Sequence, residues 1–173
     1  MSAFSFRPAL MHDETDIYNL YRRVAVVRGG LAREAHEVTP DYVHHFLSRS
    51  LSSGLSIVAL DNENCLGEIH AYKPGINVFD HVLSELTIAV DPAAQGHGIG
   101  KQLFSIFLEA VRTSMPSILR VELIARESNA KAIRMYEKLG FVAEGRFENR
   151  IRSIDGGLEA DIPMAWMNPN YKG

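Results

Sequence analysis

The sequence contains one cysteine, Cys65, so no disulfide can form within the chain. Its seven histidines lack the spacing of a metal site, and His44 and His45 are adjacent, which keeps them off a common helix face. We therefore expect no bound metal. Cys65 begins an apolar stretch and has no base nearby in the sequence to activate a thiol, so we interpret it as a small buried residue.

Long apolar runs and a strong charge of one sign are also missing. No run approaches the roughly 18 consecutive apolar residues of a transmembrane helix. The opening stretch, MSAFSFRPALMHDE, lacks the basic region and apolar core of a signal peptide. The formal net charge of −3 gives no positive field for nucleic acid. We expect a cytoplasmic protein that binds neither membranes nor nucleic acid.

The composition that is present is that of an ordinary globular protein. The hydrophobic content is 46 % and the charged content is 23 %. No repeat, low-complexity tract or Pro/Ser-rich linker divides the chain, and 173 residues fit the usual size of one domain. We predict a single domain over residues 1–173.

Local signals mark where helices begin and end. Asp13 is a candidate N-cap for an amphipathic helix, and Thr39 with Pro40 opens a second one. Gly140 stands where the last helix should end. Helices are predicted from residues 14, 40, 99 and 130, and strands at 4–10, 54–61, 65–74, 81–90, 118–125, 141–154 and 158–167.

These elements give the order β-α-α-β-β-β-α-β-α-β-β. The turn signals DNEN (61–64) and Asp155-Gly156-Gly157 predict antiparallel hairpins early and late in the chain. The strand–helix–strand unit between them predicts a parallel crossover. The sequence therefore predicts an α/β (α+β) fold, in which a central mixed twisted sheet of about seven strands carries about four helices.

The stretch 95–103, QGHGIGKQL, places three glycines between a strand and a helix. Such a turn presents backbone N–H groups at the positive end of the helix dipole, which favours a phosphate. A nucleotide-triphosphate loop is excluded, because Gln95 and Gln102 stand where a glycine and a Ser or Thr are required. A dinucleotide fingerprint also fails, because Gly100 comes one residue early. A purely structural tight turn stays open.

Gln95, Gly98 and Gly100 match the pattern Q/R-x-x-G-x-G/A, which closely resembles the pyrophosphate loop of the GNAT superfamily of N-acetyltransferases. The stretch NAKAIRMYEKLGF (129–141) is similar to the family signature N-x-x-A-x-x-x-Y-x-x-x-G-F. The predicted element order is also that of the GNAT fold, so the resemblance covers essentially the whole chain. The C-terminal part resembles the phosphinothricin and L-amino-acid acetyltransferase subgroup.

The resemblance implies acetyl-CoA as co-substrate. The family's pyrophosphate loop corresponds to Gln95, Gly96, His97, Gly98, Ile99, Gly100 and Lys101, and its pantetheine-pairing strand segment to Ile88, Ala89 and Val90. Asn129 is either a CoA contact or only a helix cap, and Lys101 either binds a phosphate or is only solvated. His97 is expected to face solvent without a catalytic role.

The resemblance also implies the catalytic groups. Tyr136 corresponds to the family acid that protonates the departing thiolate, and a buried tyrosine with a structural role is the alternative. Glu85 looks like the strand carboxylate that serves as base in several relatives, and a solvated or ion-paired glutamate is the alternative. Strand alternation places Glu85 on the same side as Thr87 and Ala89. Glu68 and His70 are further candidates for the base.

We expect direct transfer to a small primary amine, an amino acid or an analogue, because no nucleophile is placed to carry the acetyl group. The alternative acceptors are a polyamine and the N-terminus of a ribosomal protein. A non-catalytic acyl-CoA sensor is the alternative class of protein. Acceptor contacts are expected from the final hairpin and from residues 27–40, whose charged candidates are Arg28, Arg33, Glu34 and Glu37. Terminal hairpins often supply dimer contacts in members of the resembled family, so the hairpin 141–168 predicts a homodimer.

Overall fold

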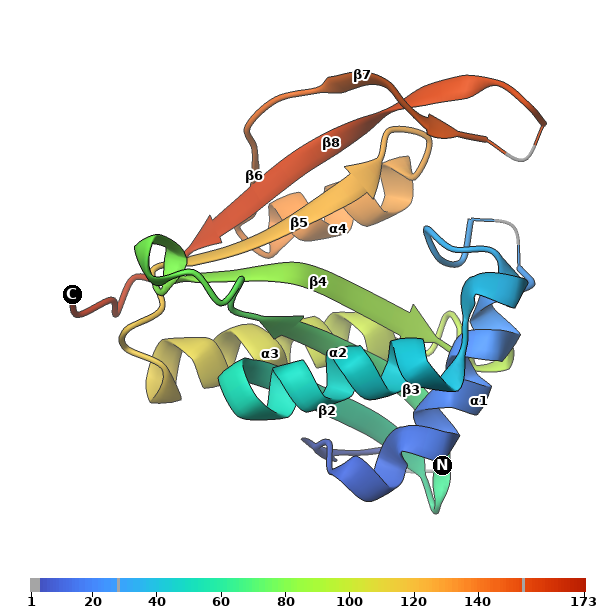
Figure 1. Cartoon of the computed structure of the whole chain (residues 1–173), viewed down its shortest axis with the longest axis horizontal. Coiled ribbons are helices and arrows are strands. Elements are labelled where there is room, and N and C mark those ends of the chain that lie inside the picture. Colours follow the sequence, from blue (N-terminus) through green and yellow to red (C-terminus); the bar gives the residue numbers. More distant parts are fainter. Residues whose placement is uncertain (1–3, 28, 154) are drawn as a thin grey trace.

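The computed structural model describes residues 4–27, 29–153 and 155–173, which form a mixed sheet of eight strands with helices on both faces (Figure 1). The strand order is β1-β2-β3-β4-β5-β8-β6, and β7 pairs with β8. The strands are β1 Ser5–Pro8, β2 Gly54–Asp61, β3 Asn64–Tyr72, β4 Val82–Val90, β5 Arg120–Arg126, β6 Val142–Ala143, β7 Phe147–Arg152 and β8 Leu158–Met167. The helices are α1 Glu14–Ala25, α2 Pro40–Ser53, α3 Ile99–Ser114 and α4 Ala130–Lys138. The predicted fold class is confirmed, and the element order is confirmed except that one predicted strand is divided into β6 and β7.

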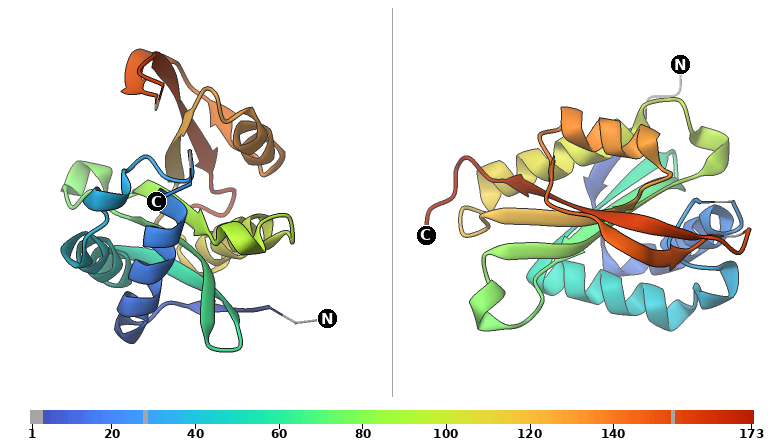
Figure 2. Two further views of the ribbon diagram at one scale, coloured as in Figure 1. Left: turned by 90° about the vertical axis from the view of Figure 1, so that its right-hand side faces the viewer. Right: turned by 90° about the horizontal axis from the view of Figure 1, so that it is seen from above.

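Helices cover both faces of the first half of the sheet (Figure 2), and an apolar layer lies between the sheet and the helices on each face. On one face α1 and α2 bury Tyr21 and Phe46 against residues such as Val58. On the other face α3 buries Phe104 and Phe107. Burying each such side chain stabilises the fold by about 1.5–3 kcal/mol, so these layers hold β2, β3 and β4 rigidly.

The two halves of the sheet meet at the parallel pair β4–β5. Its register joins Val82 to Arg120 and Leu83 to Val121, and no further pair follows among the described residues. Beyond that point the strands diverge, and Figure 1 shows β4 (green) and β5 (orange) opening towards the loop before α3. Because β5 stays paired with β8 along its whole length, the second half of the sheet swings away from β4 as one unit.

A β-bulge in β4 lies where the divergence begins. Tyr72 pairs with Ser84 and His70 pairs with Thr87, so β4 has one residue more than β3 between these two pairs. Glu85 takes a positive φ of 57°, which a non-glycine residue rarely adopts. Bulges bend a strand and increase its twist. The bulge therefore bends β4 immediately after its last pair with β5.

The prediction of one continuous strand over residues 141–154 is wrong. The structure divides it into β6 and β7, and the backbone N–H of Glu144, between them, donates to the carbonyl of Pro163 at 2.9 Å. The register with β8 is irregular between Phe147 and Ile151. Alternation of apolar residues does not reveal such a break, because the break depends on pairing with a distant strand.

Asp13 precedes α1 as predicted, but its side chain makes no cap bond to that helix. It accepts two hydrogen bonds from the guanidinium of Arg7, each of 2.7 Å, and one from the backbone of Leu10. The hydrogen bonds from Arg7 hold the pKa of this carboxyl below its usual range. Thr39, in contrast, caps α2 as predicted, accepting from the N–H of Tyr42.

An ion pair fixes the end of β4 to α1. The Arg23 Nε donates to Asp91 at 2.7 Å, and the second oxygen of Asp91 accepts from the N–H of Ala93 at 2.9 Å. Asp91 is 8 % exposed. This carboxylate therefore links α1 to the turn that leads into the glycine loop.

Replacing Asp91 with alanine should lower the free energy of unfolding by about 2 kcal/mol, because both of its charge-assisted hydrogen bonds are lost. Denaturant titration followed by circular dichroism measures the change. Asp80→Ala is the control, since Asp80 is exposed, and its effect should stay below about 0.5 kcal/mol. An equally small effect at Asp91 would show that the ion pair does not hold the loop.

Candidate functional site

The glycine loop joins β4 to α3 and carries unpaired backbone donors. No hydrogen bond joins the N–H groups of residues 95–98 to any other described residue. Gly98 is the N-cap of the 16-residue α3 and supplies no side chain to that helix end. The free N–H groups lie at the positive end of the helix dipole, which makes the loop suitable for an anion.

Two glycines of this loop have conformations that other residues avoid. Gly96 has a φ of 86° and Gly98 a φ of 80°, and a Cβ at either position would meet no atom within 4 Å. The chain itself therefore does not fill the space beside them. A glycine-lined space next to free N–H groups fits the pyrophosphate of CoA, as the sequence predicts.

The cleft between the diverging strands forms a cavity of about 520 Å³. Its lining comes from β4, β5, β8 and the segment around β6 and β7: Ser84, Glu85, Leu86, Thr87, Arg120, Glu122, Leu123, Ile124, Glu144, Gly145, Phe147, Pro163 and Met164. Residues Ile88, Ala89 and Val90 pair with β3 on one side and with no strand on the other in the described structure. Their free edge is where an extended ligand can add as a strand.

Glu85 lies in this cleft, but the predicted alternation is wrong. The bulge adds one residue between Ser84 and Thr87, so the two-residue alternation of side chains is interrupted there. Alternation therefore no longer places Glu85 on the face of Thr87 and Ala89. Its side chain has no ion-pair partner among the described residues and is exposed. A strained backbone that presents a free carboxylate to a cavity is typical of a functional position.

Tyr136 projects from α4 into the apolar layer beside α3. Its ring packs on Phe104 at 5.1 Å and on Phe141 at 6.1 Å between centroids. Burial raises the pKa of Tyr136 to about 12, above the ordinary value expected from sequence, because the ionised phenol loses solvation. The hydroxyl accordingly stays protonated at neutral pH and has no hydrogen-bond partner among the described residues.

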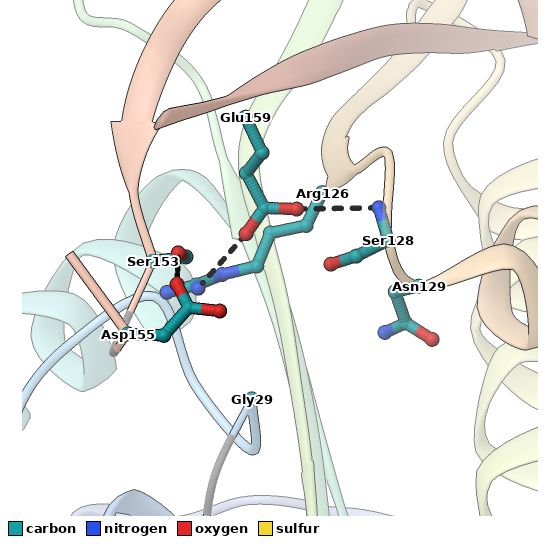
Figure 3. Close-up of a pocket in the computed structure, with 7 residues that line it drawn as sticks. All are labelled: Gly29, Arg126, Ser128, Asn129, Ser153, Asp155 and Glu159. Carbon is teal, nitrogen blue, oxygen red and sulfur yellow. Dashed lines mark hydrogen bonds and ion pairs between the residues drawn. The ribbon is translucent and has the colours of Figure 1, made fainter. Parts of the chain in front are cut away.

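Asn129 is the N-cap of α4, and its side chain accepts from the N–H of Ala132 at 3.2 Å. It also lines a second cavity of about 500 Å³ (Figure 3). Here Arg126 donates to Glu159 at 3.4 Å, and Glu159 accepts from the N–H of Ser128 at 3.3 Å. Sequence reasoning missed this pair, and Arg126 directly follows the predicted strand 118–125.

The second cavity lies between the loop after α1 and the final hairpin. Gly29 contributes from the first segment, and Ser153 and Asp155 contribute from the second. The structure thus brings together the two regions expected to contact the acceptor. Arg28 falls outside the described residues, and Arg33 is exposed with its guanidinium 3.9 Å from the ring centre of Tyr42.

The other predicted residues are placed as follows. His97 is exposed and makes an edge contact with Phe4, and Lys101 is exposed in the first turn of α3. Glu68 and His70 are buried on β3. The described residues contain no group of three His, Cys, Asp or Glu side chains arranged to hold a metal ion. No described helix is long and apolar enough to cross a membrane.

Comparison with known proteins gives one family. The acetyltransferase (GNAT) family profile matches residues 14–141. Curated relatives include mycothiol acetyltransferases, from Brachybacterium faecium with 31 % identity over 101 residues and from Streptosporangium roseum with 46 % identity over 54 residues. The matches cover 58 % and 31 % of this chain, but only 30 % and 15 % of those two proteins.

Solved structures share the whole fold at low sequence identity. A GNAT superfamily phosphinothricin acetyltransferase from Sinorhizobium meliloti in complex with acetyl-CoA has a TM-score of 0.85 at 19 % identity, covering 99 % of this chain and 91 % of that one. A putative acetyltransferase from Salmonella typhimurium, also with acetyl-CoA, has a TM-score of 0.84 at 18 % identity, covering 99 % and 98 %. At these identities the likeness shows the fold alone.

Cys65 should be unreactive in the folded protein. It is 5 % exposed, and burial raises the pKa of its thiol to about 12, so the reactive thiolate is scarce near pH 8. Reaction with a chromogenic disulfide should be more than about 100-fold slower in buffer than in guanidinium chloride. Equal rates in both would contradict the buried placement. An unreactive Cys65 leaves thiol-release assays free of protein background.

Proposed function

The chain belongs to the acetyltransferase (GNAT) family, and from this membership we propose that it transfers an acetyl group from acetyl-CoA to the primary amine of an amino acid or an amino-acid analogue. Acyl transfer and the GNAT fold are properties of the family. The observation that carries the proposal is the open edge of β4, which lies between a loop of free N–H groups and a cavity containing an unpaired carboxylate.

On the donor side, backbone groups do most of the binding. The N–H groups of residues 95–101 are proposed to hold the pyrophosphate, with Lys101 adding a positive charge. The free edge of Ile88–Val90 is proposed to pair with the pantetheine arm. Acetyl-CoA supplies an activated thioester, and an N–H of this edge is proposed to polarise the thioester carbonyl.

Tyr136 is proposed as the acid that protonates the departing thiolate. Its elevated pKa keeps the hydroxyl protonated, and that hydroxyl is not engaged by another described residue. Glu85 is proposed to attract the ammonium group of the acceptor and to accept a proton from it, because it is the unpaired carboxylate on the β4 wall of the cleft. Transfer would be direct, since the thiol of Cys65 is buried and protonated.

The second cavity favours an amino acid over a polyamine. Arg126 and Glu159 place opposite charges side by side in it. An amino acid carries both a carboxylate and an ammonium group, whereas a polyamine carries positive charge alone. Phosphinothricin acetyltransferases are among the structural neighbours, which supports the same acceptor class.

A thiol-release assay over a panel of acceptors tests the proposal. The panel comprises the amino acids, phosphinothricin, spermidine and peptides with a free N-terminal alanine, with acetyl-CoA binding measured separately by calorimetry. We expect turnover with one or more amino acids or phosphinothricin. Turnover with spermidine or peptides alone would overturn the acceptor class, and binding of acetyl-CoA without any turnover would favour a sensor.

Tyr136→Phe should lower kcat by about 100-fold while the dissociation constant of acetyl-CoA stays within about twofold, because only the proton donor is lost. In the wild-type enzyme, Tyr136 should cause no loss of activity between pH 7 and pH 10, since it ionises only near its pKa of about 12. Tyr18→Phe, on α1 away from the cleft, is the matched control. An unchanged kcat in Tyr136→Phe would remove its role as acid.

The homodimer expected from the hairpin 141–168 stays a prediction. Sedimentation equilibrium of the purified chain measures it, and a monomer at micromolar concentration would contradict it.

A further inference from the structure

A buried polar cluster interrupts the apolar layer between the sheet and helices α1 and α2. Glu68 is 0 % exposed and His70 is 2 % exposed. The Glu68 carboxylate accepts from the Tyr21 hydroxyl at 2.7 Å and from the Ser56 hydroxyl at 2.6 Å, and it lies 3.0 Å from Nδ1 of His70. Burying a carboxylate is unfavourable by several kcal/mol before its partners compensate, so packing alone does not explain this group.

One nitrogen of His70 has no partner among the described residues. The polar contacts of the ring involve Nδ1, which faces Glu68 and also lies 3.3 Å from the Tyr21 hydroxyl. Phe46 stacks on the ring at 4.0 Å between centroids, with the planes 8° apart, and fixes its orientation. No fully buried side-chain nitrogen or oxygen in the described part of the chain lacks a partner. The unpartnered Nε2 must therefore touch solvent.

His70 stands beside the cleft. It pairs across the strands with Thr87, and Thr87 lines the cavity between β4 and β5. Paired residues of an antiparallel sheet have their Cβ atoms about 5 Å apart on the same face. The imidazole is therefore one side chain away from the cavity in which the acceptor amine is proposed to react.

We propose that His70 is a second proton acceptor for the acceptor amine, acting through Nε2, with Glu68 and Tyr21 as positioning residues. This rests on the proposed function. A carboxylate at Nδ1 holds the hydrogen on that atom and leaves the lone pair of Nε2 free to accept a proton. A buried and oriented imidazole complements Glu85, whose carboxylate is exposed to water.

The protons balance in this scheme. The acceptor ammonium gives up one proton, to Nε2 of His70 or to the carboxylate of Glu85, directly or through one water, and that proton later passes to solvent. The nitrogen then forms its bond to the acetyl carbon, and the carbon–sulfur bond breaks. Tyr136 gives its proton to the thiolate and recovers the second proton of the nitrogen. The products are the amide, CoA thiol and one released proton.

The groups facing His70 set the conditions for a kinetic test. From α1 it faces Tyr21, from α2 the cluster faces Tyr42, and from its own strand Tyr72 and Glu68. Ser56 of β2 and Thr87 of β4 pair with His70 across the sheet, and their hydroxyls are neutral. Burial raises the pKa of all three tyrosines above the ordinary value, so they are protonated at pH 7.

The kinetic test compares His70→Asn with wild type at two pH values, using the best acceptor from the panel. At pH 7, where the amine is protonated, kcat/KM should fall by about 10- to 100-fold. One unit above the pKa of the amine the two enzymes should agree within about threefold, because no base is then needed. KM for acetyl-CoA should not change. His45→Asn, exposed on α2, is the control. An equal loss at both pH values would mean a structural role and overturn the proposal.

A second measurement does not depend on activity or on the variant folding. In wild-type protein labelled with ¹⁵N-histidine, the ring nitrogen shifts of His70 at pH 7 should show hydrogen on Nδ1 and a bare Nε2. In Glu68→Gln this preference should be lost. Hydrogen on Nε2, alone or on both nitrogens, would overturn the proposal even if the enzyme is active. The expected tautomer without any turnover would instead count against the proposed function.

Discussion

The short pairing between β4 and β5 is the constraint on which the rest of the site depends. Two residue pairs, Val82 with Arg120 and Leu83 with Val121, join these strands in the described structure. The backbone of β4 beyond them remains unpaired on one side, and unpaired N–H and C=O groups form hydrogen bonds wherever a partner is available. A ligand that can extend a sheet therefore has a place to bind at the centre of the molecule.

Each half of the sheet is held firmly enough for that opening to persist. β4 is anchored by β3 and by the apolar layers of α1, α2 and α3, whereas β5 is paired with β8 at seven positions. Closing the cleft would require one of these packed units to move as a whole. The bulge at Glu85 favours the open form, since it bends β4 away at the point where pairing ends. Rigidity elsewhere thus makes the open cleft a stable feature.

Polar groups at the C-terminal ends of the parallel strands β4 and β5, where the strands have diverged, depend on the same arrangement. Asp91 ties the end of β4 to α1 and so positions the glycine loop, while Arg126 and Glu159 pair across β5 and β8 at the opposite wall. Glu68 and His70 lie behind β4 in the apolar layer. The open edge of β4 and the cavity beside it are therefore built from segments far apart in the sequence.

Several features followed from local sequence signals. Thr39 with Pro40, Asn129 and the glycines of residues 95–100 specify caps and a loop through short-range bonds, so their structures were predictable from neighbouring residues. Asp13 was predictable in position but not in its bonding, because its partner Arg7 lies on a different element. The break between β6 and β7 was hidden for the same reason, since pairing with β8 decides it.

By itself the sequence determined the element order, the family and the loop that suits a pyrophosphate, because periodicity, caps and glycine spacing are local properties of the chain. Only the tertiary structure decided where Glu85 points, how the pKa of Tyr136 rises to about 12, and that Glu68, Tyr21 and Ser56 surround His70. Those outcomes depend on burial and on contacts between strands and helices distant in sequence. No local pattern encodes them, since the free energy of a charge or a proton is set by everything packed around it.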